Sequence, residues 1–163
     1  MDSHLNLYTT KHICQKIAGM TPRMLIDLVE KKFIVPAMPS SGTGEHRLYS
    51  KDNLLEIMVA ISLRGIRSSY LVTAALSLLK NYVRNKEIEQ FQFIVLRKSS
   101  NKVSPLIKFI PKGKDISAYL LKSNWEAEGY SGSILLGPTD EVDSYRYIVL
   151  NVWGMQEFIN KNF

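Results

Sequence analysis

The side chains that most often perform catalysis or bind metals are scattered along this sequence. The three histidines, His4, His12 and His46, share no metal-ligand spacing. The single cysteine, Cys14, lies near the apolar side of a predicted helix, where we expect a small buried hydrophobe. The acidic residues between 140 and 143 follow a Gly-Pro pair and are typical of a solvated turn. No nucleophile, base and orienting group come together, so we expect no enzyme, no metal and no cofactor.

Composition and charge favour a globular protein with a polyanionic partner. The chain has 163 residues, of which 45% are hydrophobic, and its formal net charge is +6. Basic surfaces gain affinity for phosphates by releasing counterions, although net charge alone indicates this only weakly. A lone cysteine is typical of a reducing compartment, and no apolar run reaches the roughly 18 residues that a membrane span needs. Residues 1–4 lack the pattern of a secretory signal. We therefore expect a soluble, cytoplasmic protein without a membrane partner.

Two short helices are predicted at the start of the chain, joined by a link of about three residues. Thr9 or Thr10 can cap the first helix, which we expect to end at Gly19. Thr21 then caps the second helix, with Pro22 at its first position, where a missing N–H costs nothing. Such spacing, with glycine in the turn, is typical of a helix-turn-helix.

Residues 36–49 are rich in Pro, Gly and Ser and predict a hairpin, or wing, with basic and aromatic residues on its return strand. Its Ser41-Gly42-Thr43-Gly44 segment lacks the lysine and the strand-to-helix context of a phosphate loop. Ser50 then caps a third helix that ends at Gly65, and a fourth begins near Ser68 or Ser69. The apolar stripe of the fourth helix is wide enough for a core face or a partner helix.

The pattern changes after about Glu89. Short apolar or alternating runs predict strands at 91–96, 106–110, 118–121, 133–136 and 145–152, followed by a short closing helix from Val152 to Phe163. The aromatic residues here admit two interpretations, a pocket for an effector or a packed core with a dimer surface, and we favour the second. They are Tyr119, Trp125, Tyr130, Tyr145, Tyr147 and Trp153. The predicted class is α+β, with an all-α winged helix-turn-helix over 1–88 and a small α+β domain over 89–163.

The first half of the chain resembles the MerR family of bacterial transcription regulators. The likeness is carried by three blocks: Tyr8-Thr9-Thr10, Met20-Thr21-Pro22-Arg23-Met24-Leu25, and His46-Arg47-Leu48-Tyr49-Ser50-Lys51-Asp52-Asn53-Leu54. Ile34-Val35-Pro36 lies between the second and third blocks. The third block is the most specific, because it follows a glycine-rich wing. The resemblance covers residues 7–79 and stops before the C-terminal unit.

This resemblance implies that the second helix enters the major groove while the wing contacts flanking phosphates. Thr21 and Arg23 are then candidates for base or phosphate contact, and Arg47 for the DNA backbone. The remaining candidates are residues near these three or at the start of the first helix: Thr10, Lys11, Asp27, His46, Tyr49 and Lys51.

The sequence also departs from the family pattern. The family's Arg-Tyr-Tyr in the second helix is replaced by Ile26-Asp27-Leu28. Asp27 would repel a phosphate, or it could read a base by accepting from cytosine N4. Only about 20 residues are available for the long dimerisation helix of the family. Dimerisation is therefore expected to use a shorter helix or the C-terminal unit.

Two functional hypotheses involve DNA, and a third is an interaction protein that does not bind DNA. The first is a homodimeric, sequence-specific transcription regulator that binds double-stranded DNA and is associated with the bacterial nucleoid. The alternative is a DNA-architectural or excisionase-like factor whose C-terminal unit recruits another protein. A small-molecule or protein effector of the C-terminal unit stays open in both hypotheses.

Overall fold

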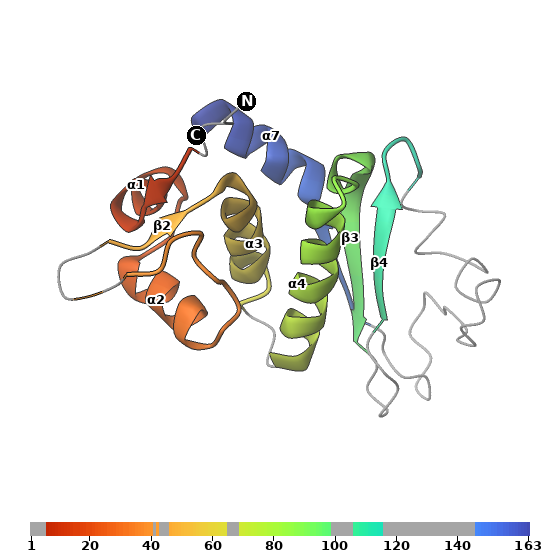
Figure 1. Ribbon diagram of the computed structural model, residues 1–163. Helices are drawn as coiled ribbons and strands as arrows, with labels where there is room; N and C mark the ends of the chain where they lie inside the picture. The colour runs from red at the N-terminus through yellow and green to blue at the C-terminus, as the bar shows by residue number, and fades with distance from the viewer. Residues whose placement is uncertain (1–5, 41, 43–45, 65–68, 99–105, 116–145) are drawn as a thin grey trace. The chain divides into compact units, whose positions relative to one another are not determined.

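The protein has an α+β fold in two compact units (Figure 1). The structure, a computed structural model, describes residues 6–40, 42, 46–64, 69–98, 106–115 and 146–163. Unit 1 comprises residues 1–89 and 152–163, and unit 2 comprises residues 90–151. Unit 2 is thus inserted between two segments of unit 1.

Unit 1 begins with strand β1 (Tyr8–Thr9), helix α1 (Thr10–Lys16) and helix α2 (Pro22–Glu30). Thr9 caps α1 by accepting from the backbone N–H of His12 at 3.3 Å. The predicted end at Gly19 is wrong, because α1 ends at Lys16 and Ile17 turns into extended backbone, where its side chain is buried. The link is accordingly longer than expected and spans residues 17–21. Gly19 has a φ of +75°, which glycine adopts without strain.

Strand β2 (Leu48–Tyr49) pairs antiparallel with β1, Tyr8 opposite Tyr49. On its other side Leu48 exchanges two backbone hydrogen bonds of 3.0 Å with Met38. The segment from 38 to 48 therefore closes as a hairpin at its base. Residues 41 and 43–45 of the predicted wing lie outside the described residues.

Helix α3 (Lys51–Ser62) is the centre of unit 1, and most of its residues are buried. Ser50 caps it as predicted, and the helix ends three residues before Gly65. Helix α4 (Ser69–Arg84) and a 3-10 turn, η1 (Ile88–Gln90), lead out of the unit. No helix that the structure describes is long and apolar enough to span a membrane.

The closing helix, α7 (Val152–Asn162), corrects the expected domain division. The sequence pattern predicts it in the C-terminal domain over 89–163, but its contacts assign it to unit 1, where it packs on α3. Its Val152 and Ile159 are buried, and the Tyr8 hydroxyl donates to the Phe163 carbonyl at 2.8 Å. The end of the chain thus returns to its first strand.

Unit 2 contains a three-stranded antiparallel sheet in the order β4-β3-β5. The strands are β3 (Phe91–Lys98), β4 (Leu106–Pro111) and β5 (Arg146–Asn151), close to three of the predicted strands. Ile94 of the central strand faces Phe109 on one side and Leu150 on the other. The predicted strands at 118–121 and 133–136 lie outside the described residues, as do Tyr119, Trp125, Tyr130 and Tyr145.

Candidate nucleic-acid interface

The N-terminal end of α2 presents an exposed, capped helix start. Thr21 Oγ1 accepts from the backbone N–H of Met24 at 3.2 Å, and Thr21, Pro22 and Arg23 are all exposed. The first N–H groups of a helix carry partial positive charge and attract anions. Because Leu25 is completely buried, α2 is fixed to the core one turn from this end. The sequence-predicted Thr21 and Arg23 are therefore held together on a rigid element.

Arg23 forms an ion pair with Asp27 one turn further along α2. Arg23 Nε lies 3.1 Å from Asp27 Oδ1, and the two side chains are 76% and 40% exposed. Exposed pairs of this kind contribute about 0–1 kcal/mol to stability. A phosphate can therefore compete for the guanidinium at small cost. Arg23 and Asp27 were predicted as separate contacts, and their four-residue spacing on a helix is the sequence signal for the pair.

The basic residues of the hairpin and of the start of α3 form a second group. His46 and Lys51 are exposed, and Arg47 is half-buried beside the β1–β2 pair. Lys11 is exposed on the first turn of α1. In Figure 1, α1, α2 and β2 lie on one side of α3, and α7 runs above α3 with its end beside β1.

Tyr49, which was predicted to contact DNA, belongs to the core instead, and its side chain is only 1% exposed. Burial raises the pKa of Tyr49, and a hydrogen bond with the Thr10 side chain and the charge of Arg47 only partly offset this effect. The apolar part of the ring favoured packing over exposure. Thr10, half-buried beside it, therefore helps to position β2.

A buried polar network that the sequence analysis missed joins α2 to the hairpin. Asn53 Oδ1 accepts from the backbone N–H of Ala37 at 3.0 Å and from that of Ser50 at 3.2 Å. Asn53 Nδ2 donates to the Val35 carbonyl at 3.0 Å and to Glu56 at 3.4 Å. One buried amide thus holds the segment that connects α2 with the hairpin. The only sequence signal for it is an amide at the third position after the Ser50 cap.

Lys80 of α4 completes this network. Its Nζ lies 4.0 Å from Glu56 Oε2 and donates to the Phe33 carbonyl at 3.1 Å. Phe33 lies three residues after the end of α2, and its N–H donates to the Leu28 carbonyl, so the lysine ties the end of α2 to α4. Asn53 and Glu56 are three residues apart on α3 and are therefore neighbours, but Lys80 comes from α4, and no sequence spacing brings it to them.

Glu56 gives the network a pH dependence that can be measured. Burial raises the pKa of Glu56, Lys80 and the Asn53 hydrogen bond lower it in part, and Asp52 raises it slightly. A carboxyl group whose pKa is higher in the folded state binds more protons there, so stability falls as pH rises through that pKa. Replacing Glu56 by Gln should remove this contribution. We expect the free energy of unfolding of the variant, relative to the wild type, to rise from about pH 4 to pH 8.

Urea unfolding at several pH values measures this difference. Glu157→Gln removes one carboxyl group at an exposed site on α7 and is the matched control. Its free energy of unfolding, relative to the wild type, should change less with pH. A difference between wild type and Glu56→Gln that does not change with pH would contradict the assignment.

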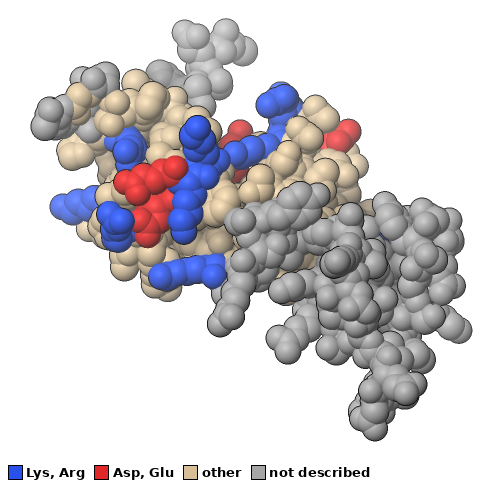
Figure 2. All heavy atoms as spheres, turned by 90° about the horizontal axis from the view of Figure 1, so that it is seen from below, with Lys and Arg blue, Asp and Glu red and all other residues tan. Residues whose placement is uncertain are grey.

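Charged side chains gather on one face of unit 1. Figure 2 shows Lys and Arg around a smaller group of Asp and Glu there. The face is therefore mixed and not uniformly basic, in agreement with the Arg23–Asp27 pair.

Cys14 is half-buried, and burial raises the pKa of its thiol. In the described part of the chain, no three His, Cys, Asp or Glu side chains are grouped to hold a metal ion.

Comparison of the chain with protein-family models and with curated proteins finds no match.

Proposed function

We propose that the chain is a sequence-specific, double-stranded DNA-binding regulator whose α1, α2 and hairpin act as a winged helix-turn-helix. The observation that carries the proposal is the exposed N-terminal end of α2, which is capped by Thr21 and fixed by buried Leu25. A helix start of this kind fits the major groove, where the first residues of the helix meet base edges. The resemblance of residues 7–79 to the MerR family points the same way.

In this proposal the two groups of candidate residues have different tasks. Thr21 retains a hydroxyl donor after capping, and Arg23 can exchange its partner Asp27 for a phosphate or a guanine edge. Arg47, His46, Lys51 and Lys11 supply cations for the flanking phosphates. The Asn53 network keeps the connection between these two groups at a fixed length.

The central experiment is a binding titration with the DNA upstream of the gene. Fluorescence anisotropy in the presence of excess unrelated duplex separates specific from non-specific affinity. Specific binding is expected to be at least about 1,000-fold tighter. Light scattering of the complex gives the number of chains, which we propose is two. Equal affinity for both duplexes would contradict a sequence-specific regulator.

The charge of Asp27 provides a prediction about non-specific binding. Asp27→Asn removes an acidic group one turn from the N-terminal end of α2 and releases Arg23. We expect the affinity for unrelated duplex DNA to rise about three- to tenfold at low salt. If Asp27 reads a cytosine, the affinity for the specific site falls at the same time.

Glu157→Gln on α7 changes the net charge equally and is the control. Anisotropy at low salt measures both variants. An increase of the same size in both would mean that the effect comes from net charge and that α2 does not face the DNA.

The insertion of unit 2 supports one alternative. α4 ends at Arg84 and the sheet begins at Phe91, so unit 2 occupies the place of a long dimerisation helix. This arrangement favours a unit with a protein partner of its own, as in a DNA-architectural or excisionase-like factor. Two chains in the light-scattering measurement favour the regulator, and one chain on bent DNA favours the alternative.

A further inference from the structure

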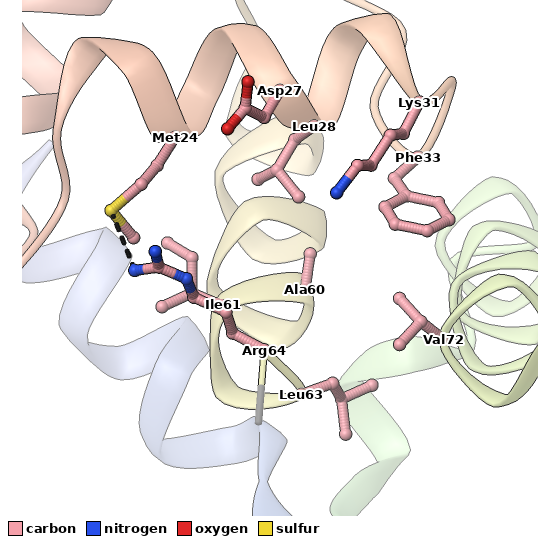
Figure 3. A pocket seen from close by; sticks show the side chains of 10 residues that line it. All are labelled: Met24, Asp27, Leu28, Lys31, Phe33, Ala60, Ile61, Leu63, Arg64 and Val72. Carbon is pink, nitrogen blue, oxygen red and sulfur yellow. Dashed lines mark hydrogen bonds between the residues drawn. The ribbon is translucent and has the colours of Figure 1, made fainter. Parts of the chain in front are cut away.

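A cavity of about 360 Å³ lies within unit 1, between α2, the end of α3 and α4 (Figure 3). This volume is within the range of small-molecule sites in proteins. Its lining comes from all three helices and from the residues that follow α2 and α3, among them Leu28, Lys31, Phe33, Ile61 and Arg64. None of these residues belongs to unit 2, where the sequence analysis had placed any effector.

The inner wall of the cavity is apolar. Ala60, Leu63 and Val72 are buried, and Leu28, Phe33 and Ile61 are half-buried around them. The methyl group of Ala60 is the smallest side chain in this wall, so the space opens over α3. An apolar ring placed here would be removed from solvent and would contact carbon atoms on several sides.

The rim of the cavity carries two cations and one acid. Lys31 and Arg64 are exposed, and the Asp27 carboxylate is already 3.1 Å from Arg23 Nε. Arg64 Nη1 donates to Met24 Sδ at 3.3 Å, and a thioether is a weak acceptor. In Figure 3 the Lys31 ammonium points toward the middle of the lining residues, and the Arg64 guanidinium lies at the Met24 end. The cavity thus has a cation toward each end, with the Asp27 carboxylate on the same rim.

We propose that this cavity binds a small organic anion with an apolar, ring-containing body and one carboxylate. The ring lies against Leu28, Phe33 and Ile61, and the carboxylate accepts from Arg64 and Lys31. Arg64 exchanges its weak bond to sulfur for a charge-assisted one, which is shorter and stronger. The site stands on the lining of unit 1 alone and does not depend on DNA binding.

The test uses 2-naphthoate as the probe and 2-naphthamide as its uncharged counterpart. Both have the same ring system, so a difference in affinity reports the rim charges. Heteronuclear NMR titration of the full chain is expected to show saturable 2-naphthoate shifts around the cavity, with about tenfold weaker binding of the amide. Shifts that do not saturate up to about 10 mM, a range in which even weak sites fill, or equal affinity of the two probes, would overturn the proposal.

Three variants decide where the probe lies. Arg64→Gln and Lys31→Gln should each weaken 2-naphthoate about five- to tenfold and leave 2-naphthamide unchanged. Lys161→Gln, exposed on α7, is the charge control and should change neither. Ile61→Trp narrows the cavity and should abolish binding of both probes, with circular dichroism showing that the fold is retained. Unchanged naphthoate affinity in Arg64→Gln and Lys31→Gln would overturn the proposed site, and so would an equal loss in Lys161→Gln.

Discussion

Replacing Arg23 and Arg47 together by alanine is expected to weaken duplex DNA binding roughly 60-fold at about 0.1 M salt. Each cation on a phosphate contributes about 0.9 to the slope of log K against log salt, so two contribute about 1.8 log units relative to 1 M salt. Arg23 also neutralises Asp27 at 3.1 Å, and its removal leaves an acidic group on the proposed DNA-facing surface. The loss of DNA affinity is therefore expected to be at least about 60-fold.

Anisotropy titrations between about 0.05 and 0.3 M salt measure both the affinity and its salt slope, which should fall by about 2. The matched control removes the exposed Lys16 and Lys161, which lie outside both groups of candidate residues. This control carries the same net charge as the Arg23→Ala, Arg47→Ala protein. The proposed surface is wrong if both double variants lose affinity equally, or if the arginine variant keeps the slope of the wild type.

Asn53→Ala should lower the free energy of unfolding by about 3 kcal/mol. Asn53 is 7% exposed, and its amide bonds both the Ala37 N–H and the Val35 carbonyl. Its loss leaves a donor and an acceptor of the connecting segment without their part-buried bonds, and a group that stays shielded from water costs about 1–3 kcal/mol. It also removes one of the hydrogen bonds of the buried Glu56 carboxyl.

Chemical denaturation measures this effect, and Ser50→Ala is its control. Ser50 caps the same helix and accepts from Asn53 N–H at 3.2 Å, so its removal reports the value of the cap alone, about 1 kcal/mol. Asn53→Asp keeps the acceptor for Ala37 but loses the donor to Val35 and puts a second carboxyl group beside Glu56. The free energy of unfolding of Asn53→Asp, relative to the wild type, should therefore fall as pH rises. A loss in Asn53→Ala no larger than that in Ser50→Ala would show that the connecting segment does not depend on this amide.

The sequence alone determined the features that arise from neighbouring residues. Thr21 and Ser50 cap their helices as predicted, because a side-chain oxygen reaches a backbone N–H only three residues away. Proline at the first position of α2 and glycine in the turn before it act through their own backbone geometry. The candidates Thr21 and Arg23 follow from this local order, and so do the three strands of unit 2 that the structure describes.

Only the tertiary structure decided which distant segments share a core. α7 belongs to unit 1 because its apolar residues pack on α3, and the Tyr8–Phe163 bond joins residues 155 positions apart. Tyr49 is not available as a DNA contact because its ring is buried in the core, where it forms a hydrogen bond with the Thr10 side chain. The Asn53–Glu56–Lys80 network and the cavity beside α2 likewise arise from helices that meet in space. Caps and turns follow from interactions within a few residues, whereas burial and polar pairing depend on which surfaces the whole chain brings together.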